Sequence, residues 1–241
     1  MSKMKLALIG SDNNTCIKTE GLESANHLIK LNGENLIERI VRIGRNNGIS
    51  KVFWVINFHD PELEEYLSRN NFGISIKLIE QHTGSFLQSI TALASYITKE
   101  SVFITNANSA FIESEFSEFV TYSLLQEDAD GILAITRYND NEKPLCVAMN
   151  DEDIILKFSN SKDGYSWAAG GIYYFSPEIF KEAKSAFDSG ITGIEKFLQF
   201  LIVRGYTLKG FSFSKIIKIE HAADIVIAED LIAGNKKYLN L

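Results

Sequence analysis

The sequence predicts an α/β fold built on a doubly wound sheet that is mixed but mostly parallel. Short apolar runs alternate with helical patterns from Met4 to Asn106. These runs end in turn-forming residues, which is typical of buried strands in a parallel sheet. Shorter strands and helices continue less regularly after residue 112. Strict alternation of this kind favours right-handed strand–helix–strand units, so the first half is expected to carry the parallel strands.

The first half contains four predicted strands with helices between them. The strands are expected over residues 4–10, 51–57, 74–79 and 102–105, and the helices over 35–46, from 61 onward and over 87–97. The first helix should end at Asn46–Gly48, because Asn and Gly accept the left-handed conformation. Pro61 suits the first turn of the second helix.

The second half mixes helices with shorter strands. A helix is expected over 115–127, and strands over 131–136, 145–149, 154–158, 171–175, 206–213 and 216–219. Ser176–Glu178 has the form of an N-cap followed by proline. Thr192–Glu195 has capping-box spacing. A terminal helix is expected to start near Ala228.

Composition and charge exclude several classes of partner. The chain has 241 residues and a formal net charge of −7, which argues against nucleic acid or an anionic membrane as partner. No apolar run approaches the roughly 20 residues that span a bilayer, and no signal peptide is expected. Cys16 and Cys146 are predicted to be reduced thiols of a cytoplasmic protein. The four histidines show no mutual metal-ligand spacing.

Seven segments in order resemble the sugar-phosphate nucleotidyltransferase family. They are Met4–Gly10 as the first strand, Leu31–Arg39 against "NGKPLIER", Asn47–Val52 against "GIxEI", Gln81 with Gly84–Ser85, Asn106–Ser109 against "NGDT", Gly170–Glu178 against "GGIYxFSPE" and Asp224–Leu231 against "DIDTPEDL". The resemblance implies a nucleotide-diphospho-sugar transferase-like, Rossmann-like fold. It also implies one domain over 1–241, with a nucleotide-binding half at 1–112 and a sugar-binding half at 113–241.

The resemblance further implies a reaction and a set of site residues. The family joins a nucleoside triphosphate to a sugar 1-phosphate, releases pyrophosphate and uses Mg²⁺, so the expected partners are a nucleoside triphosphate or nucleotide-sugar and a sugar phosphate. Self-association is left open. The expected nucleotide-binding residues are Gly10, Ser11, Asn13, Asn14, Thr15, Gln81, Gly84 and Ser85. The expected sugar-binding residues are Tyr165, Gly170 and Gly171, and the expected metal ligands are Asn108 and Asp224.

The chain departs from the family pattern at its charged positions. Asp12–Cys16 stands where the family has Gly-x-Gly-Thr-Arg, and Asn26 stands where it has a lysine. Lys18, Lys30 and Lys162 are the candidate catalytic cations, by proximity in sequence alone. Loss of a phosphate-binding charge typically costs roughly 2–4 kcal/mol of transition-state stabilisation.

Three functions therefore remain open at this stage. The first is an active nucleotidyltransferase with substitute cations. The second is a family member without catalysis that binds a nucleotide, a sugar phosphate or a protein. The third is a glycosyltransferase on a related fold, which expects an Asp-x-Asp motif where this chain has Asn106–Asn108. For Asp224 a role as helix N-cap or first-turn acid competes with metal binding.

Overall fold

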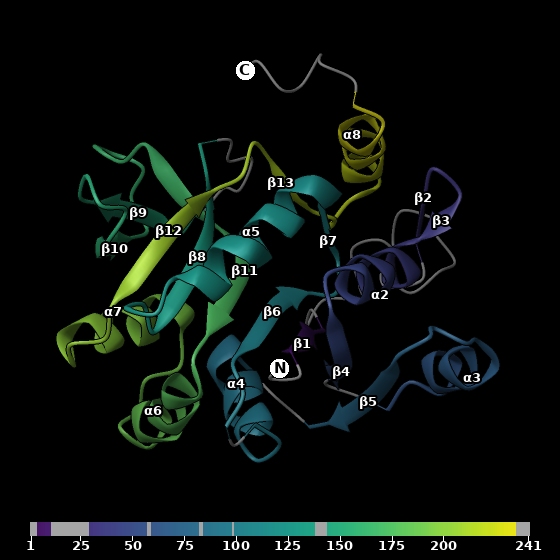
Figure 1. The fold of residues 1–241 in the computed structure, drawn as a ribbon, viewed down its shortest axis with the longest axis horizontal. Helices are drawn as coiled ribbons and strands as arrows, with labels where there is room; N and C mark the ends of the chain where they lie inside the picture. Colours follow the sequence, from purple (N-terminus) through teal and green to yellow (C-terminus); the bar gives the residue numbers. More distant parts are fainter. Residues whose placement is uncertain are drawn as a thin grey trace.

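A nine-stranded sheet forms the centre of the computed structural model, which describes residues 4–10, 29–56, 59–81, 84–97, 99–137 and 144–234 (Figure 1). Along its main path the strands run β10-β9-β11-β6-β1-β4-β5, and β8 and β12 extend it from β11. Their bounds are β1 Met4–Ile9, β4 Ile49–Ile56, β5 Ser75–Glu80, β6 Val102–Asn106, β8 Gly131–Thr136, β9 Cys146–Met149, β10 Ile155–Ser159, β11 Trp167–Phe175 and β12 Leu208–Ser212.

The parallel part of the sheet comes from the first half of the chain. Strand β1 lies between β4 and β6 and is parallel to both, with Leu8 opposite Trp54 on one side and Thr105 on the other. Side chains alternate between faces along a strand. Accordingly Leu6 and Leu8 join one hydrophobic cluster, while the intervening alanine and Ile9 join the other. The uninterrupted apolar run of β1 is thus explained by burial on both faces.

Helices cover both faces of the sheet. The cluster on one face includes residues of α2 (Leu36–Asn46), α5 (Glu113–Leu125) and α8 (Ala222–Ile232). The cluster on the other includes residues of α4 (Phe86–Ala94), α6 (Pro177–Asp188) and α7 (Ile194–Val203). The remaining helix, α3 (Pro61–Arg69), lies beside the edge strand β5 (Figure 1). This confirms the doubly wound α/β class.

Strand β11 joins the two halves of the chain. It is antiparallel to β6, β8 and β9, and Ala168 pairs with β8 on one side and with β9 on the other, while β12 returns parallel to β8. Its pairing with β8 is interrupted between Ala169 and Tyr173. The sheet is therefore mixed, and the antiparallel strands lie in the half where the sequence pattern was least regular.

The structure corrects two local predictions and confirms the position of a third. Helix α8 begins at Ala222, six residues before the predicted start. Helix α7 has Gly193 as its N-cap without a side-chain bond, so the capping box predicted from Thr192 is wrong. Ser176 occupies the N-cap position of α6, but its hydroxyl makes no capping bond.

In the described residues two small two-stranded sheets lie outside the main sheet, and of their four strands the sequence analysis predicted only the one at 216–219. Strands β2 (Lys30–Leu31) and β3 (Glu34–Asn35) form a hairpin, and β7 (Ser109–Phe111) pairs with β13 (Ile216–Lys218). The hairpin contacts α8, because Asn32 donates its backbone N–H to Glu229. None of the helices in the described ranges is long and apolar enough to cross a bilayer.

Candidate functional site

The candidate site lies where the parallel strands end. Gly10 follows β1, Gln81 follows β5, and Ala107–Asn108 forms the turn that follows β6. Their backbones are joined to this edge, since Gly10 donates to Val55 and Ala107 donates to Ile9. Open α/β sheets bind ligands at the carboxyl ends of their strands. Three strand spacings separate β5 from β6, or roughly 14 Å, so the edge is wide enough for an extended ligand.

Gly10 is required by close packing at this edge. Its N–H donates to the Val55 carbonyl at 2.8 Å. A Cβ at this position would lie 3.0 Å from the same carbonyl oxygen, tighter than nearly all real contacts. The glycine therefore lets the end of β1 pass close to β4. Whether it also approaches a phosphate stays a prediction, since Ser11, Asn13, Asn14, Thr15 and Lys18 lie outside the described residues.

Asn108 is buried, and both its side chain and its backbone carbonyl are hydrogen-bonded to Ile219. Its side-chain Nδ2 donates to the Ile219 carbonyl at 2.9 Å, and its own carbonyl accepts from Ile219 N–H at 2.9 Å. The Oδ1 atom is buried and has no hydrogen-bond partner among the described residues. A buried polar atom without a partner is costly in free energy. The side chain is thus held in one position, and its Oδ1 is an acceptor without a partner among the described residues.

Asp224 lies close to the same segment. Its Oδ2 accepts the backbone N–H of Glu220 at 2.8 Å and of His221 at 2.7 Å. Both bonds satisfy donors at the start of α8, where a carboxylate is favourable. Asp224 is therefore a first-turn helix acid, as one of the two alternatives predicted. Because Glu220 directly follows Ile219, the partner of Asn108, the two expected metal ligands belong to adjoining segments.

Two further polar groups beside this turn were missed by the sequence analysis. Ser109, the first residue of β7, has a buried hydroxyl without a partner among the described residues. Arg39, on α2, is 3% exposed and donates Nη2 to the Phe111 carbonyl at 2.7 Å, while its Nη1 lacks a described partner. Burial is the main cause that lowers the pKa of this guanidinium. No local sequence signal marks either group, since their burial is produced by tertiary packing.

The residues expected to hold a base follow β5. Gln81 has an exposed side chain, and its backbone N–H donates to the Ile56 carbonyl at 3.0 Å. Ser85 is the N-cap of α4, and its hydroxyl accepts from Gln88 N–H. Gly84 in turn donates its N–H to the Gln88 side chain. Gln81 is thus free to face a ligand, whereas Ser85 already has a structural role.

The expected sugar residues lie on and before β11. Gly171 has φ of +81°, and a Cβ there would lie 3.0 Å from Asn106 Nδ2. A Cβ on Gly170 would lie 2.4 Å from the Ile216 side chain. Packing of β11 against its neighbours therefore explains both glycines without a ligand. Tyr165 is half-buried in the loop after β10, where its N–H donates to the Lys162 carbonyl.

Two of the candidate cations, Lys30 and Lys162, make no described bond with Asn108 and Asp224, whose side-chain oxygens are called the oxygen pair below. Lys30 is exposed on β2, and Lys162 is exposed in the loop between β10 and β11. Neither lysine has a hydrogen bond or ion pair with Asn108 or Asp224 among the described contacts. The structure places Asn108 and Asp224 in neighbouring segments, and it shows no bond from either lysine to them among the described residues.

A hollow of about 310 Å³ lies between α2 and the residues that follow α3. None of the predicted site residues lines it. Its charged groups already have partners, since Arg42 bonds Glu34 and Glu113 while Arg45 donates to the Phe72 carbonyl. The hollow is therefore lined by polar side chains that already bond to one another, and it does not indicate a ligand-binding site.

Comparison with solved structures finds the same fold in several nucleotidyltransferases. An inositol-1-phosphate CTP transferase from T. maritima superposes with a TM-score of 0.80 at 16% identity, over 98% of each chain. A protein from Bacillus anthracis, assigned as a glucose-1-phosphate thymidylyltransferase and solved in complex with sucrose, gives 0.82 at 16% identity, over 98% of this chain and 99% of that one.

A third similar structure is HddC from Yersinia pseudotuberculosis, with a TM-score of 0.70 at 14% identity over 95% of this chain and 98% of that one. No curated protein sequence matches the chain. The model of the nucleotidyl transferase family matches residues 23–233, which is most of the sequence. The chain therefore belongs to the nucleotidyl transferase family.

Proposed function

We propose that this protein binds a nucleoside triphosphate at the carboxyl edge of the sheet and transfers its nucleotidyl group to a sugar 1-phosphate. In this reaction a phosphate oxygen of the sugar forms a bond to the α-phosphorus, and the bond to the leaving pyrophosphate breaks. The observation that carries the proposal is the buried Oδ1 of Asn108 just after β6, which has no partner among the described residues. Family membership supplies the reaction class.

The residues at this edge fit Mg²⁺, the ion that the family implies. Mg²⁺ takes oxygen ligands and is usually held by one or two carboxylates together with substrate phosphates and water. Asn108 offers a buried acceptor without a described partner, and Asp224 offers the carboxylate oxygen that takes no part in its two capping bonds. When bound with the nucleotide, the ion would neutralise phosphate charge. Asn108 and Asp224 would be its protein ligands.

The other residues of the edge would position the two substrates. The exposed amide of Gln81 can both donate to and accept from a base edge, and its backbone is fixed to β4. Gly170, Gly171 and Tyr165 would border the sugar phosphate. Alignment of two anions contributes strongly to a reaction that needs little covalent chemistry from the protein. We place this activity in the cytoplasm.

A second candidate function is nucleotide or sugar-phosphate binding without catalysis. It is favoured because neither Lys30 nor Lys162 bonds to Asn108 or Asp224 among the described contacts. The third candidate cation, Lys18, lies outside the described residues. Electrostatic stabilisation is usually the largest contribution to such catalysis, and each missing donor typically costs about 10²–10³ in rate. Binding would be affected less, because it does not require stabilisation of the transition state.

The deciding experiment is calorimetric titration with each nucleoside triphosphate, with and without Mg²⁺, followed by pyrophosphate-release assays across sugar 1-phosphates. We expect Mg²⁺-dependent binding of one nucleotide, weakened in Gln81→Ala and Asn108→Ala. Gln126→Ala is the matched control, since Gln126 bonds Lys209 at the end of α5. Binding without pyrophosphate release from any sugar phosphate would support the second candidate. Absence of binding to every nucleotide would refute nucleotidyl transfer and nucleotide binding, and the same titration with sugar 1-phosphates would then decide whether sugar-phosphate binding remains.

A further inference from the structure

We propose that His59, Glu64 and Glu80 form a binding site for one transition-metal ion, of which Zn²⁺ is the best match. Glu80 is the last residue of β5, Glu64 lies in the first turns of α3, and His59 lies just before that helix. They belong neither to the oxygen pair of Asn108 and Asp224 nor to any segment that the family resemblance marked as functional. The inference is independent of the proposed nucleotidyl transfer.

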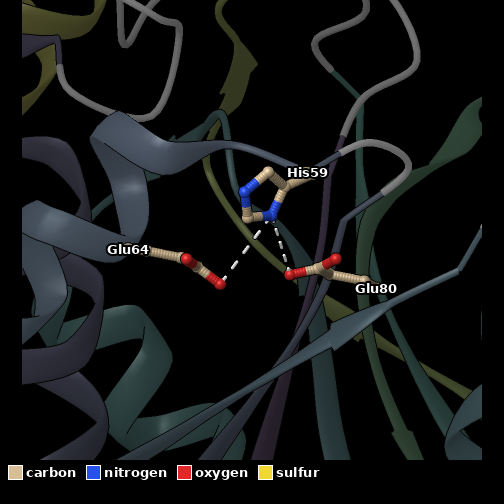
Figure 2. A group of neighbouring side chains, drawn as sticks. All are labelled: His59, Glu64 and Glu80. Atoms are coloured by element: carbon tan, nitrogen blue, oxygen red, sulfur yellow. Dashed lines mark hydrogen bonds and ion pairs between the residues drawn. The ribbon is translucent and has the colours of Figure 1, made fainter.

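The three side chains point toward one another (Figure 2). His59 Nδ1 lies 3.3 Å from Glu80 Oε1 and 4.0 Å from Glu64 Oε1. One ligand atom from each residue lies within 4.8 Å of the others. Zinc bonds to imidazole nitrogen and carboxylate oxygen are about 2.0–2.2 Å long. Ligand atoms around one such ion are therefore separated by roughly 3–4 Å, so small side-chain adjustments would complete the site.

The backbone around these residues is fixed before any ion binds. Glu80 is the last residue of β5, and its neighbour across the ladder is Ile56 at the end of β4. The N–H of the next residue, Gln81, donates back to the Ile56 carbonyl at 3.0 Å. This bond holds the end of β5 against β4, so the position from which the Glu80 side chain departs is defined.

Helix α3 is fixed in the same way at its start. Asp60 is its N-cap, and its side chain accepts the Leu63 N–H at 3.0 Å. The Glu64 N–H donates to the Asp60 carbonyl at 3.0 Å. His59 directly precedes this cap, which places the imidazole and the Glu64 carboxylate on the same side of the first turn. A site built on such positions requires less ordering when the ion binds.

Local charge also favours a cation at this position. Among the described ion pairs, Glu64 and Glu80 pair only with His59 and with no lysine or arginine. Glu65, the next residue of α3, shows the contrast, because it pairs with Arg69. When the imidazole is neutral, two carboxylates face each other with no positive group between them. An ion would relieve that repulsion.

The ligand set selects the chemical class of the ion. Imidazole nitrogen is a common ligand of Zn²⁺, Cu²⁺ and Ni²⁺, whereas Mg²⁺ and Ca²⁺ prefer sites built from oxygen. Imidazole nitrogen and carboxylate oxygen are both zinc ligands, and three protein ligands leave a fourth position for water. All three side chains are well exposed to solvent. Access is therefore open, and the site lies next to the exposed Gln81.

Such an ion would link two elements that are otherwise joined by few bonds. Glu64 belongs to α3 and Glu80 to the edge strand β5, so a shared ion would fasten the helix to the strand end. Edge elements are usually the least stable parts of a sheet. Metal binding should therefore raise the thermal midpoint of the protein as well as produce a binding isotherm.

The test is titration of the chelator-treated full chain with Zn²⁺ by calorimetry, with Co²⁺ absorption as a second probe of ligation. We expect one equivalent that is lost, or weakened at least about tenfold, in His59→Ala and in Glu80→Gln. Glu65→Gln is the matched control and should retain it. A wild-type chain that binds no equivalent, or a His59→Ala chain that binds with unchanged affinity and stoichiometry, would overturn the proposal. Nucleotide binding without added Zn²⁺ is measured in parallel, and its loss or retention bears only on the proposed nucleotidyl transfer.

Discussion

Replacing Asn108 with aspartate changes a single group of atoms at the most constrained point of the site. The Asn108 Nδ2 donates to the Ile219 carbonyl at 2.9 Å, and the side chain is 2% exposed. In Asn108→Asp a carboxylate oxygen would face that carbonyl in place of the donor. The variant therefore tests whether the amide is as buried and as firmly held as the structure shows.

The magnitude follows from two contributions. Loss of the hydrogen bond costs about 1 kcal/mol. A buried carboxylate without a positive partner costs about 3–5 kcal/mol. We expect the metal-free variant to lose about 4–6 kcal/mol of unfolding free energy at pH 8, a large part of the roughly 5–15 kcal/mol that is typical of proteins. Asn108→Ala should lose much less, because it removes the unpartnered Oδ1 together with the donor.

The loss should depend on pH in a defined direction. Burial disfavours the charged form, so the pKa of the introduced carboxyl should be higher in the folded than in the unfolded protein. Below the unfolded value, near 3.9, both states are protonated and the acid can donate to the Ile219 carbonyl. The destabilisation should therefore grow as pH rises through the interval between the two pKa values and then level off. Asn108→Ala should show no such dependence.

Denaturant titration followed by tryptophan fluorescence would measure these effects, since Trp54 is fully buried and reports on the core. The curves are recorded at several pH values, without metal and with Mg²⁺. Mg²⁺ should restore stability to Asn108→Asp more than to Asn108→Ala if these oxygens bind the ion. An Asn108→Asp variant as stable as wild type at pH 8 without metal would refute the reasoning, because the amide would then not be buried against Ile219.

Three smaller changes test other parts of the structure. Gly171→Ala should lower stability by about 1–2 kcal/mol, because φ is +81° and its Cβ would meet Asn106; an unchanged thermal midpoint would contradict this. Lys5 lies 3.0 Å from Glu100, and its hydrogen bond holds the pKa of Glu100 below the ordinary value. Lys5→Met should raise that pKa in an NMR titration, and the stability difference between the two proteins should be present at neutral pH and vanish as pH falls through the folded pKa; an unshifted pKa would count against the ion pair. Burial raises the pKa of the Cys146 thiol, so alkylation mapped by mass spectrometry should modify it only after unfolding, and rapid labelling of the native protein would show that it is accessible.

Most of the fold could be predicted because its signals are local. Short apolar runs and terminal turn residues predict the parallel strands, and the helices of the first half begin and end within a few residues of expectation. Errors occur where contacts between residues far apart in the sequence determine where a strand or helix begins. Strand β11 begins at Trp167, before the predicted Gly171, because pairing with β9 extends it. Helix α8 begins early because Asp224 caps its first turn.

The candidate site could be predicted only through family resemblance. No pattern within Asn106–Ser109 indicates that Asn108 donates to Ile219, a residue 111 positions away. The His59 cluster was missed for the same reason. Spacing among the four histidines excluded a His-rich metal site, but the partners of His59 are carboxylates from a helix and from a strand 21 residues away. Such constellations are produced by the topology of the sheet.

The bonds around Asn108 connect the site to the last helix. Asn108 is bonded at both its side chain and its carbonyl to Ile219, and Asp224 is bonded to the next residue, Glu220. Helix α8, which Asp224 caps, also contacts the β2–β3 hairpin through the bond from Asn32 to Glu229. A ligand that binds the side-chain oxygens of Asn108 and Asp224 would therefore also stabilise the position of α8. Binding at this edge should accordingly slow amide exchange in the first turn of α8 and in the hairpin, although neither needs to contact the ligand.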